Sequence, residues 1–254
     1  MKASFLNHSR PLITAMLQAK SPERTEELLE KALAGGADAV GMQLCQFEPR
    51  YRNREVYERI FKIADRVPVY ATNYRARENA GKSDETLAEE LLELAECGAT
   101  LCDVMGDYFC PTEGEFTTDP VAIEKQKKLI SDLHARGAEV LMSSHVLKFT
   151  PAERVLEIAL GHKERGADIC KIVVGADTME QQIENLRIIN LLKEKLDIPF
   201  LFLSGGECRI VRRIGGEIGC CMYLCVCEYD ELATKAQPLI SDIVSVREMF
   251  DNAN

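Results

Sequence analysis

Residues 166–174, which read GADICKIVV, join the end of one helix to one buried strand. The glycine stands where a helix over 151–165 would stop, and the run 168–174 has the length and β-branched content of an interior strand. The same junction recurs at three other places, namely Gly36-Ala37, Gly98-Ala99 and Gly137-Ala138. Repeated use of one helix-to-strand junction indicates a fold built from one βα unit.

Short apolar runs alternate with amphipathic segments along the whole chain. We expect strands over 11–16, 38–44, 68–73, 100–105, 138–143, 168–174, 199–204 and 220–226. We expect helices over 22–34, 54–65, 84–97, 120–136, 151–165, 178–196, 207–217 and 238–250. Such units closing on themselves predict an α/β protein of one domain, a (β/α)8 TIM barrel over residues 1–254. The alternative is an open, doubly wound sheet.

The charge and the cysteines limit the classes of partner. A net charge of -10 argues against binding to nucleic acid or to an anionic membrane. The chain lacks both the run of ~20 apolar residues that a membrane helix needs and a signal-peptide core, so we expect it in the cytoplasm. The ten cysteines fall mostly in apolar runs and lack the spacing of zinc ligands. We therefore expect no metal and no cofactor.

Lys171 stands in the middle of the apolar strand over 168–174. A buried ammonium group costs several kcal/mol unless it is paired, so an interior lysine either has a carboxylate partner or is kept neutral. A neutral lysine is a nucleophile that forms an imine with a ketone. His145 ends the run of the preceding strand, where it would act as a proton carrier beside the lysine. Structural pairing and Schiff-base chemistry both remain open for Lys171.

With these residues in place, the chain resembles the type I 3-dehydroquinate dehydratase family over the whole barrel. The family's catalytic lysine lies in an Ala-Asp-x-x-Lys-Ile strand, matched by residues 167–172, and its histidine by residues 143–145. The resemblance implies a hydro-lyase of the shikimate pathway, which dehydrates 3-dehydroquinate or a related cyclic hydroxy-keto carboxylate through an imine on Lys171. It also implies that His145 carries the protons and that Glu78 assists His145.

The resemblance further implies which residues bind the substrate. Arg213, which precedes a Gly-Gly-Glu sequence, matches the arginine that binds the substrate carboxylate, and Gln237 matches a glutamine that closes over the substrate. Gln43 stands at a position of the second strand where the family has a charged residue. Tyr74 stands at the position after the third strand where the family has an arginine, unless Arg75 takes that role.

Other departures point the same way. Gly41 replaces a second charged residue on the second strand, Met105 an acidic one on the fourth, and Ala233 a serine near the last helix. Asn73 and Arg75 are candidates to replace the lost hydroxyl-binding groups. This pattern predicts the same type of reaction on a different substrate.

The residues leave several functions open. The chain could be a 3-dehydroquinate dehydratase with an unusual hydroxyl site, a class I aldolase-like lyase that cleaves a carbon–carbon bond, or an inactive carboxylate-binding relative. In each case the partner is a small keto-carboxylate, with no nucleic acid and no membrane. We also expect a homodimer.

Overall fold

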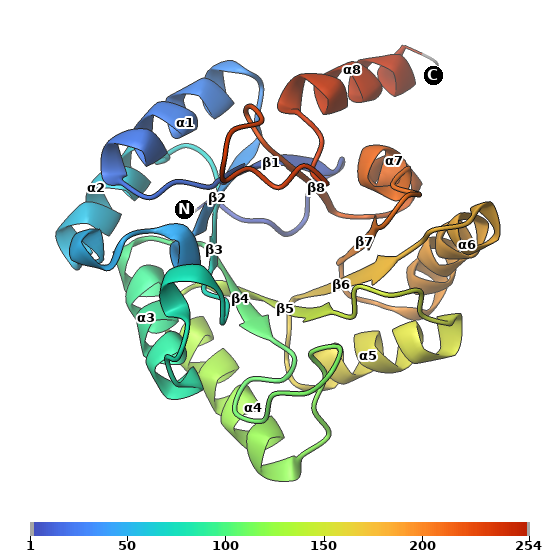
Figure 1. Cartoon of the computed structure of the whole chain (residues 1–254), viewed down its shortest axis with the longest axis horizontal. Coiled ribbons are helices and arrows are strands. Elements are labelled where there is room, and N and C mark those ends of the chain that lie inside the picture. Colours follow the sequence, from blue (N-terminus) through green and yellow to red (C-terminus); the bar gives the residue numbers. More distant parts are fainter. Residues whose placement is uncertain (1–2, 253–254) are drawn as a thin grey trace.

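A computed structural model describes residues 3–252, in which strands and helices alternate along the chain (Figure 1). The strands are β1 (Leu12–Leu17), β2 (Ala39–Gln43), β3 (Val69–Thr72), β4 (Leu101–Met105), β5 (Glu139–His145), β6 (Ile169–Gly175), β7 (Phe200–Gly205) and β8 (Met222–Cys225). The helices are α1 (Pro22–Ala34), α2 (Arg54–Ile63), α3 (Asp84–Cys97), α4 (Pro120–Ala135), α5 (Ala152–Glu164), α6 (Met179–Lys195), α7 (Val211–Ile218) and α8 (Ile240–Asp251). Three short 3-10 helices, which the sequence did not predict, lie at Leu44–Gln46, Pro49–Tyr51 and Arg77–Asn79.

The strands form one parallel sheet that curls into a nearly closed barrel. Their order is β7-β6-β5-β4-β3-β2-β1-β8, so that β8 lies beside β1. Cys221, just before β8, donates its N–H to the carbonyl oxygen of Phe200 in β7 at 2.9 Å. The helices surround the sheet in chain order (Figure 1). The prediction of a (β/α)8 barrel is confirmed, and the open doubly wound alternative is wrong because the strand order never reverses.

Helix caps explain several of the element boundaries. Ser21 and Asp119 each accept a hydrogen bond from the backbone N–H three residues later, and each precedes a proline at the first position of α1 or α4. Inside the fold, Cys170, Cys220 and Cys225 are buried among apolar side chains, as expected of cysteines that act as small hydrophobes. Over residues 3–252, no helix is long and apolar enough to cross a membrane.

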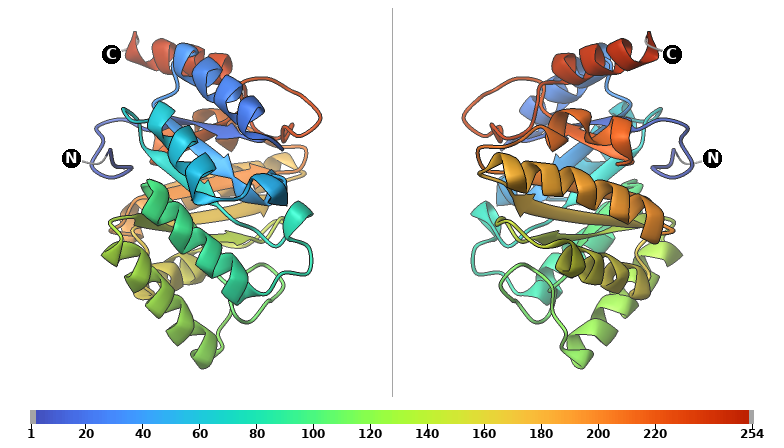
Figure 2. Two further views of the ribbon diagram at one scale, coloured as in Figure 1. Left: turned by 90° about the vertical axis from the view of Figure 1, so that its left-hand side faces the viewer. Right: turned by 90° about the vertical axis from the view of Figure 1, so that its right-hand side faces the viewer.

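The two ends of the barrel differ in what covers them. The amino-terminal segment lies at one end, while the loops after β4 and β8 extend from the other (Figure 2). Phe5 holds the amino-terminal segment in place, because its backbone N–H donates to Glu139 at the start of β5 at 2.8 Å. The carboxyl ends of the strands therefore remain available for a site, bordered by the β4–α4 loop (106–119) and the β8–α8 loop (226–239).

Candidate active site

Lys171 lies inside the barrel with only 3% of its surface exposed. Its Nζ donates to the hydroxyl oxygen of Tyr74 at 2.6 Å and lies 3.2 Å from a carboxylate oxygen of Asp103 on β4. The hydroxyl of Tyr70 on β3 lies 3.3 Å away. The buried lysine therefore has a carboxylate partner, which was one of the two possibilities left open by the sequence.

Asp103 is the centre of this polar cluster. The carboxylate accepts hydrogen bonds from Ser143 Oγ at 2.6 Å, from Tyr74 Oη at 2.5 Å and from Tyr70. Burial alone would raise the pKa of this carboxyl, but the charge of Lys171 and the three hydroxyl donors outweigh burial and lower it. Asp103 is thus held as a carboxylate at the bottom of the barrel mouth.

Above this cluster lies a cavity of about 360 Å³ at the carboxyl ends of the strands. Lys171 and His145 both line it, so the structure brings together the predicted nucleophile and the predicted proton carrier. Gln43 and Gln237, predicted to bind substrate, line it as well. The other lining residues are Met16, Gln18, Tyr74, Glu115, Leu147, Val173, Leu203, Arg212, Leu224 and Thr234.

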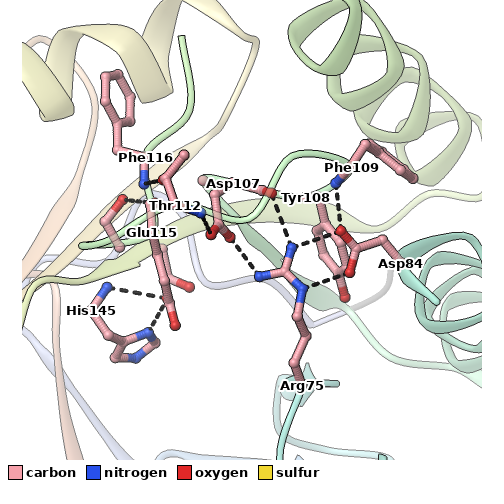
Figure 3. Close-up of polar contacts among 12 residues, drawn as sticks. Arg75, Asp84, Asp107, Tyr108, Phe109, Thr112, Glu115, Phe116 and His145 are labelled. Carbon is pink, nitrogen blue, oxygen red and sulfur yellow. Dashed lines mark hydrogen bonds and ion pairs between the residues drawn. The ribbon is translucent and has the colours of Figure 1, made fainter. Parts of the chain in front are cut away.

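The imidazole of His145 is held by a carboxylate from the β4–α4 loop. His145 Nδ1 lies 2.6 Å from Glu115 Oε2, and the backbone N–H of His145 donates to the same oxygen at 3.2 Å (Figure 3). On another side the ring meets Tyr74 edge to face, with the ring centroids 5.2 Å apart. A carboxylate on Nδ1 fixes the orientation of the imidazole and leaves Nε2 for proton transfer.

The backbone places Glu115 in a conformation that few residues adopt. Its φ is 51°, in the left-handed region. Its carbonyl oxygen accepts a hydrogen bond from Ser144 Oγ at 2.6 Å. The same oxygen would lie 2.6 Å from a Cβ at Gly106, so the close approach requires glycine there. The strand β5, through Ser144 and His145, therefore holds both the backbone and the side chain of Glu115.

Arg75 braces the β4–α4 loop instead of lining the cavity. The guanidinium of Arg75 binds Asp84 at 2.6 Å and Asp107 at 2.8 Å (Figure 3). Asp107 in turn accepts the backbone N–H of Thr112 at 2.7 Å. Burial opposes the charge on Arg75, but the two carboxylates outweigh it and raise its pKa. These contacts hold the β4–α4 loop at Asp107 and at Thr112, on the way to Glu115.

Two other expected site residues also lie away from the cavity. Asn73 is buried, and its amide donates to the carbonyl of Leu87 and to Glu90, which are structural contacts. Glu78 is exposed in the 3-10 helix Arg77–Asn79, and the carboxylate on His145 is that of Glu115. The structure thus departs from the expectations for Asn73, Arg75 and Glu78, because the loop after β3 packs against α3 and the β4–α4 loop.

The arginine at the cavity is Arg212, whereas Arg213 is exposed. A step of one residue turns a helix by about 100°, which is why neighbours at the start of α7 face opposite environments. Arg212 Nε donates to the carbonyl of Ser204 at 2.7 Å. Burial, together with the charge of Arg209, lowers the pKa of Arg212 to about 10. Among residues 3–252, no carboxylate forms an ion pair with Arg212, so a buried cation faces the cavity without a counter-ion.

Another part of the cavity lining is built from neutral polar side chains. Gln18 Nε2 donates to Gln43 at 2.9 Å and to Thr234 at 3.2 Å, which ties the β8–α8 loop to β1 and β2. Gln237 is 8% exposed, and its side-chain oxygen has no partner in the described part of the chain. A buried acceptor without a donor is costly, so a bound molecule that donates a hydrogen bond would satisfy it.

The sequence interpretation missed four residues of this site, namely Tyr74 as a lysine partner, Asp103, Arg212 and Glu115. A signal existed for Asp103, because it interrupts the apolar run 100–105 as Lys171 interrupts 168–174, and two buried opposite charges pair. No local pattern marks Glu115. Over residues 3–252, no group of three metal-binding side chains converges.

Comparison with known sequences gives one family and several relatives. The profile of the family described as "Type I 3-dehydroquinase" matches residues 13–251. A 3-dehydroquinate dehydratase of Alkaliphilus oremlandii is 35% identical over 94 residues, which cover 36% of this chain and 37% of that protein. The enzyme of the same name from Lactiplantibacillus plantarum is 28% identical over 128 residues, 46% of this chain and 50% of the relative. The matched segments thus span half of each relative or less.

Solved structures match over nearly the full length. The 3-dehydroquinate dehydratase of Geobacillus kaustophilus has a TM-score of 0.82 and 16% identity, covering 96% of this chain and 92% of that one. The type I enzyme of Clostridium difficile, solved with covalently modified comenic acid, has a TM-score of 0.79 and 17% identity, covering 97% and 95%. At this identity the likeness shows the shared barrel fold.

Proposed function

The chain belongs to the type I 3-dehydroquinase family, and on this premise we propose that it is a Schiff-base hydro-lyase of a cyclic hydroxy-keto carboxylate. The observation that supports the proposal best is the meeting of Lys171 with the His145–Glu115 pair in one cavity. A nucleophilic amine and an oriented imidazole are the two groups that imine-based elimination requires. A protein that only binds carboxylates has no need of this pair.

The first half of the reaction is imine formation. Lys171, an ammonium group at rest, passes one proton to its neighbours, and Nζ then adds to the substrate ketone carbon. The carbonyl oxygen leaves as water after it receives that proton and one more from Nζ, so that the third proton stays on the nitrogen. The product is an iminium ion bonded to Lys171. Asp103, which lies 3.2 Å from Nζ, is placed to stabilise the positive charge on the iminium nitrogen.

The second half is elimination and release. His145 Nε2 removes the proton alpha to the iminium carbon, and the resulting enamine expels the hydroxyl group at the next carbon. His145, now an imidazolium stabilised by Glu115 at Nδ1, returns the proton to that departing oxygen. Water then hydrolyses the conjugated iminium, which releases an enone and restores Lys171 as an ammonium group.

The lining of the cavity indicates the class of substrate. Arg212 supplies one cationic site for a carboxylate, whereas Gln18, Gln43, Thr234 and Gln237 supply neutral hydrogen-bonding groups. The remaining wall is apolar, with Met16, Val173, Leu203 and Leu224 among its residues. The substrate we propose carries one carboxylate and a ketone, and fewer ring hydroxyls than 3-dehydroquinate.

We predict weak turnover of 3-dehydroquinate itself. Gln43 and Gly41 stand at the positions where the family resemblance places charged groups that hold ring hydroxyls. A site without partners for a hydroxyl discriminates against a substrate that carries it by a factor of about 10². Formation of the enone is measured by its absorbance, for 3-dehydroquinate and for analogues that lack one hydroxyl. We expect kcat/KM for 3-dehydroquinate below the ordinary range of ~10⁴–10⁸ M⁻¹s⁻¹, and a higher value for an analogue. A value inside that range would contradict the changed substrate.

Arg212 and Arg213 form a matched pair for testing the carboxylate site. Arg212→Gln removes the buried cation at the cavity, and hydrogen bonds to a charged group contribute about 1.5–3 kcal/mol. We therefore expect KM for a keto-carboxylate to rise about 10- to 100-fold. Arg213→Gln should leave KM unchanged, because that side chain is exposed. Melting curves identify any loss of folding, and an equal rise of KM in both variants would contradict the assignment.

We also propose that the enzyme works in the cytoplasm as a homodimer. Buried thiols such as Cys170 and Cys220 are compatible with a reducing compartment. The oligomeric state is measured by light scattering during gel filtration. A monomer would contradict the dimer without affecting the chemistry of the cavity.

A further inference from the structure

The hydroxyl of Tyr74 lies between the two charges of the buried ion pair. It accepts a hydrogen bond from Lys171 Nζ at 2.6 Å and donates one to Asp103 Oδ2 at 2.5 Å. The direct separation of Nζ from the same Asp103 oxygen is 3.2 Å. Each of the two hydrogen bonds made by Tyr74 is therefore shorter than the direct hydrogen bond from the lysine to the carboxylate. Tyr74 also lines the cavity beside Lys171, so a ketone bound at Nζ comes within reach of the hydroxyl that is bonded to Nζ.

The ion pair creates a difficulty for the proposed function. An ammonium group paired with a buried carboxylate has no lone pair, so Lys171 must lose a proton before it attacks the ketone. Bulk water has little access to Nζ, because Lys171 is buried and Tyr70, Tyr74 and Asp103 surround the amine. The proton must therefore leave through one of these neighbours.

We propose that Tyr74 is a catalytic residue that relays protons between Lys171, Asp103 and the substrate oxygen, an inference that rests on the proposed Schiff-base function. Tyr74 Oη takes a proton from Nζ as its own proton passes to Asp103 Oδ2, which frees the lone pair. After the attack, Asp103 returns that proton through Tyr74 to the carbinolamine oxygen. The second nitrogen proton follows to the same oxygen, and water leaves. Asp103 ends as a carboxylate and Tyr74 as a neutral hydroxyl.

The electrostatics of the cluster favour a relay over a stable tyrosinate. Burial, reinforced by the charge of Asp103, raises the pKa of Tyr74 well above its usual value. Tyr74 therefore keeps its proton unless it receives another at the same time. Tyr70 has the same two partners, with Nζ at 3.3 Å, but it does not line the cavity and cannot reach the substrate oxygen. Tyr70 is thus a matched control.

The test measures imine formation alone. The probe is 3-oxocyclohexane-1-carboxylate, which has the ketone and the carboxylate but no hydroxyl to eliminate. Enzyme and probe are mixed, portions are quenched with excess sodium borohydride at successive times, and intact mass gives the fraction of labelled protein. We expect Tyr74→Phe to slow labelling about 100-fold at pH 7, within the usual range for a lost acid–base group. Tyr70→Phe also removes one hydroxyl from Nζ and Asp103 but leaves the relay intact, so we expect a smaller loss of at most about tenfold, the size of one lost hydrogen bond.

The pH dependence separates a relay from a merely structural role. Hydroxide can replace the missing relay, so the deficit of Tyr74→Phe should shrink between pH 7 and pH 9.5. A deficit that is equal at both pH values, labelling at the wild-type rate, or an equal loss in Tyr70→Phe would each overturn the relay and leave the proposed function standing. An unlabelled wild type would overturn the proposed function and the relay together. Circular dichroism melts confirm that each variant is folded.

Discussion

Replacement of Lys171 by methionine will abolish dehydration and will also destabilise the fold. Activity is lost because none of the other described residues that line the cavity can form the imine. Stability falls because Asp103 keeps its buried charge but loses its counter-ion. Breaking a buried pair costs about 3–5 kcal/mol, and we expect about 3 kcal/mol because three hydroxyl donors remain on the carboxylate. Urea denaturation measures the change, and dehydration is followed by enone absorbance.

A second replacement identifies the cause of this loss. In the double variant Lys171→Met/Asp103→Asn, the uncompensated charge is gone, so most of the lost stability should return while activity stays absent. The free energies of unfolding of the wild type, both single variants and the double variant complete the cycle. Equal stability of Lys171→Met and the wild type would show that Asp103 is not held as a charged partner of the lysine.

His145→Gln should lower the rate of dehydration by about 10³-fold, in the range for loss of a general acid–base group. Imine formation should continue, because Lys171, Tyr74 and Asp103 are untouched. The variant is therefore expected to accumulate an adduct that borohydride traps, while enone absorbance rises slowly. Turnover near the wild-type rate would remove His145 from the mechanism.

Replacing Glu115 tests whether its carboxylate orients His145, and replacing Glu78 is the control. Glu115→Gln keeps the size of the side chain but weakens the bond to His145 Nδ1, and we expect a loss of about 10- to 100-fold in kcat. Glu78→Gln should have no effect, because that side chain is exposed. The opposite outcome would restore the role that the family resemblance assigned to Glu78.

The sequence predicted the barrel well because every βα unit carries its own local signals. Apolar runs, glycine junctions and proline-containing caps fix the boundaries of most elements to within about two residues. The helix after β7 is an exception, since it begins at Val211 and not near 207. Strand β7 continues through Gly205, and residues 206–210 form the turn that precedes the helix.

The site residues that lie on strands could be predicted from the sequence. Lys171 and His145 lie on adjacent strands, so the period of two and the strand order bring them to the same mouth. Glu115 was not predictable, because its place depends on a loop folded by contacts with Arg75 and Ser144, which are distant in sequence. The family motif assigned Glu78 and Arg213 to the site from their positions in the sequence alone, and both side chains are exposed in the structure. A motif gives an order of residues along the chain, whereas burial and side-chain direction decide the contacts.

The most direct test of the central claim is the location of the borohydride-trapped adduct. Wild-type enzyme is reduced in the presence of 3-oxocyclohexane-1-carboxylate, digested with trypsin and analysed by mass spectrometry. An adduct on Lys171 blocks cleavage there, so the label should appear on the peptide of residues 166–187, and Lys171→Met should remain unlabelled. A label on a different lysine, or a wild type without any label, would contradict imine chemistry at Lys171.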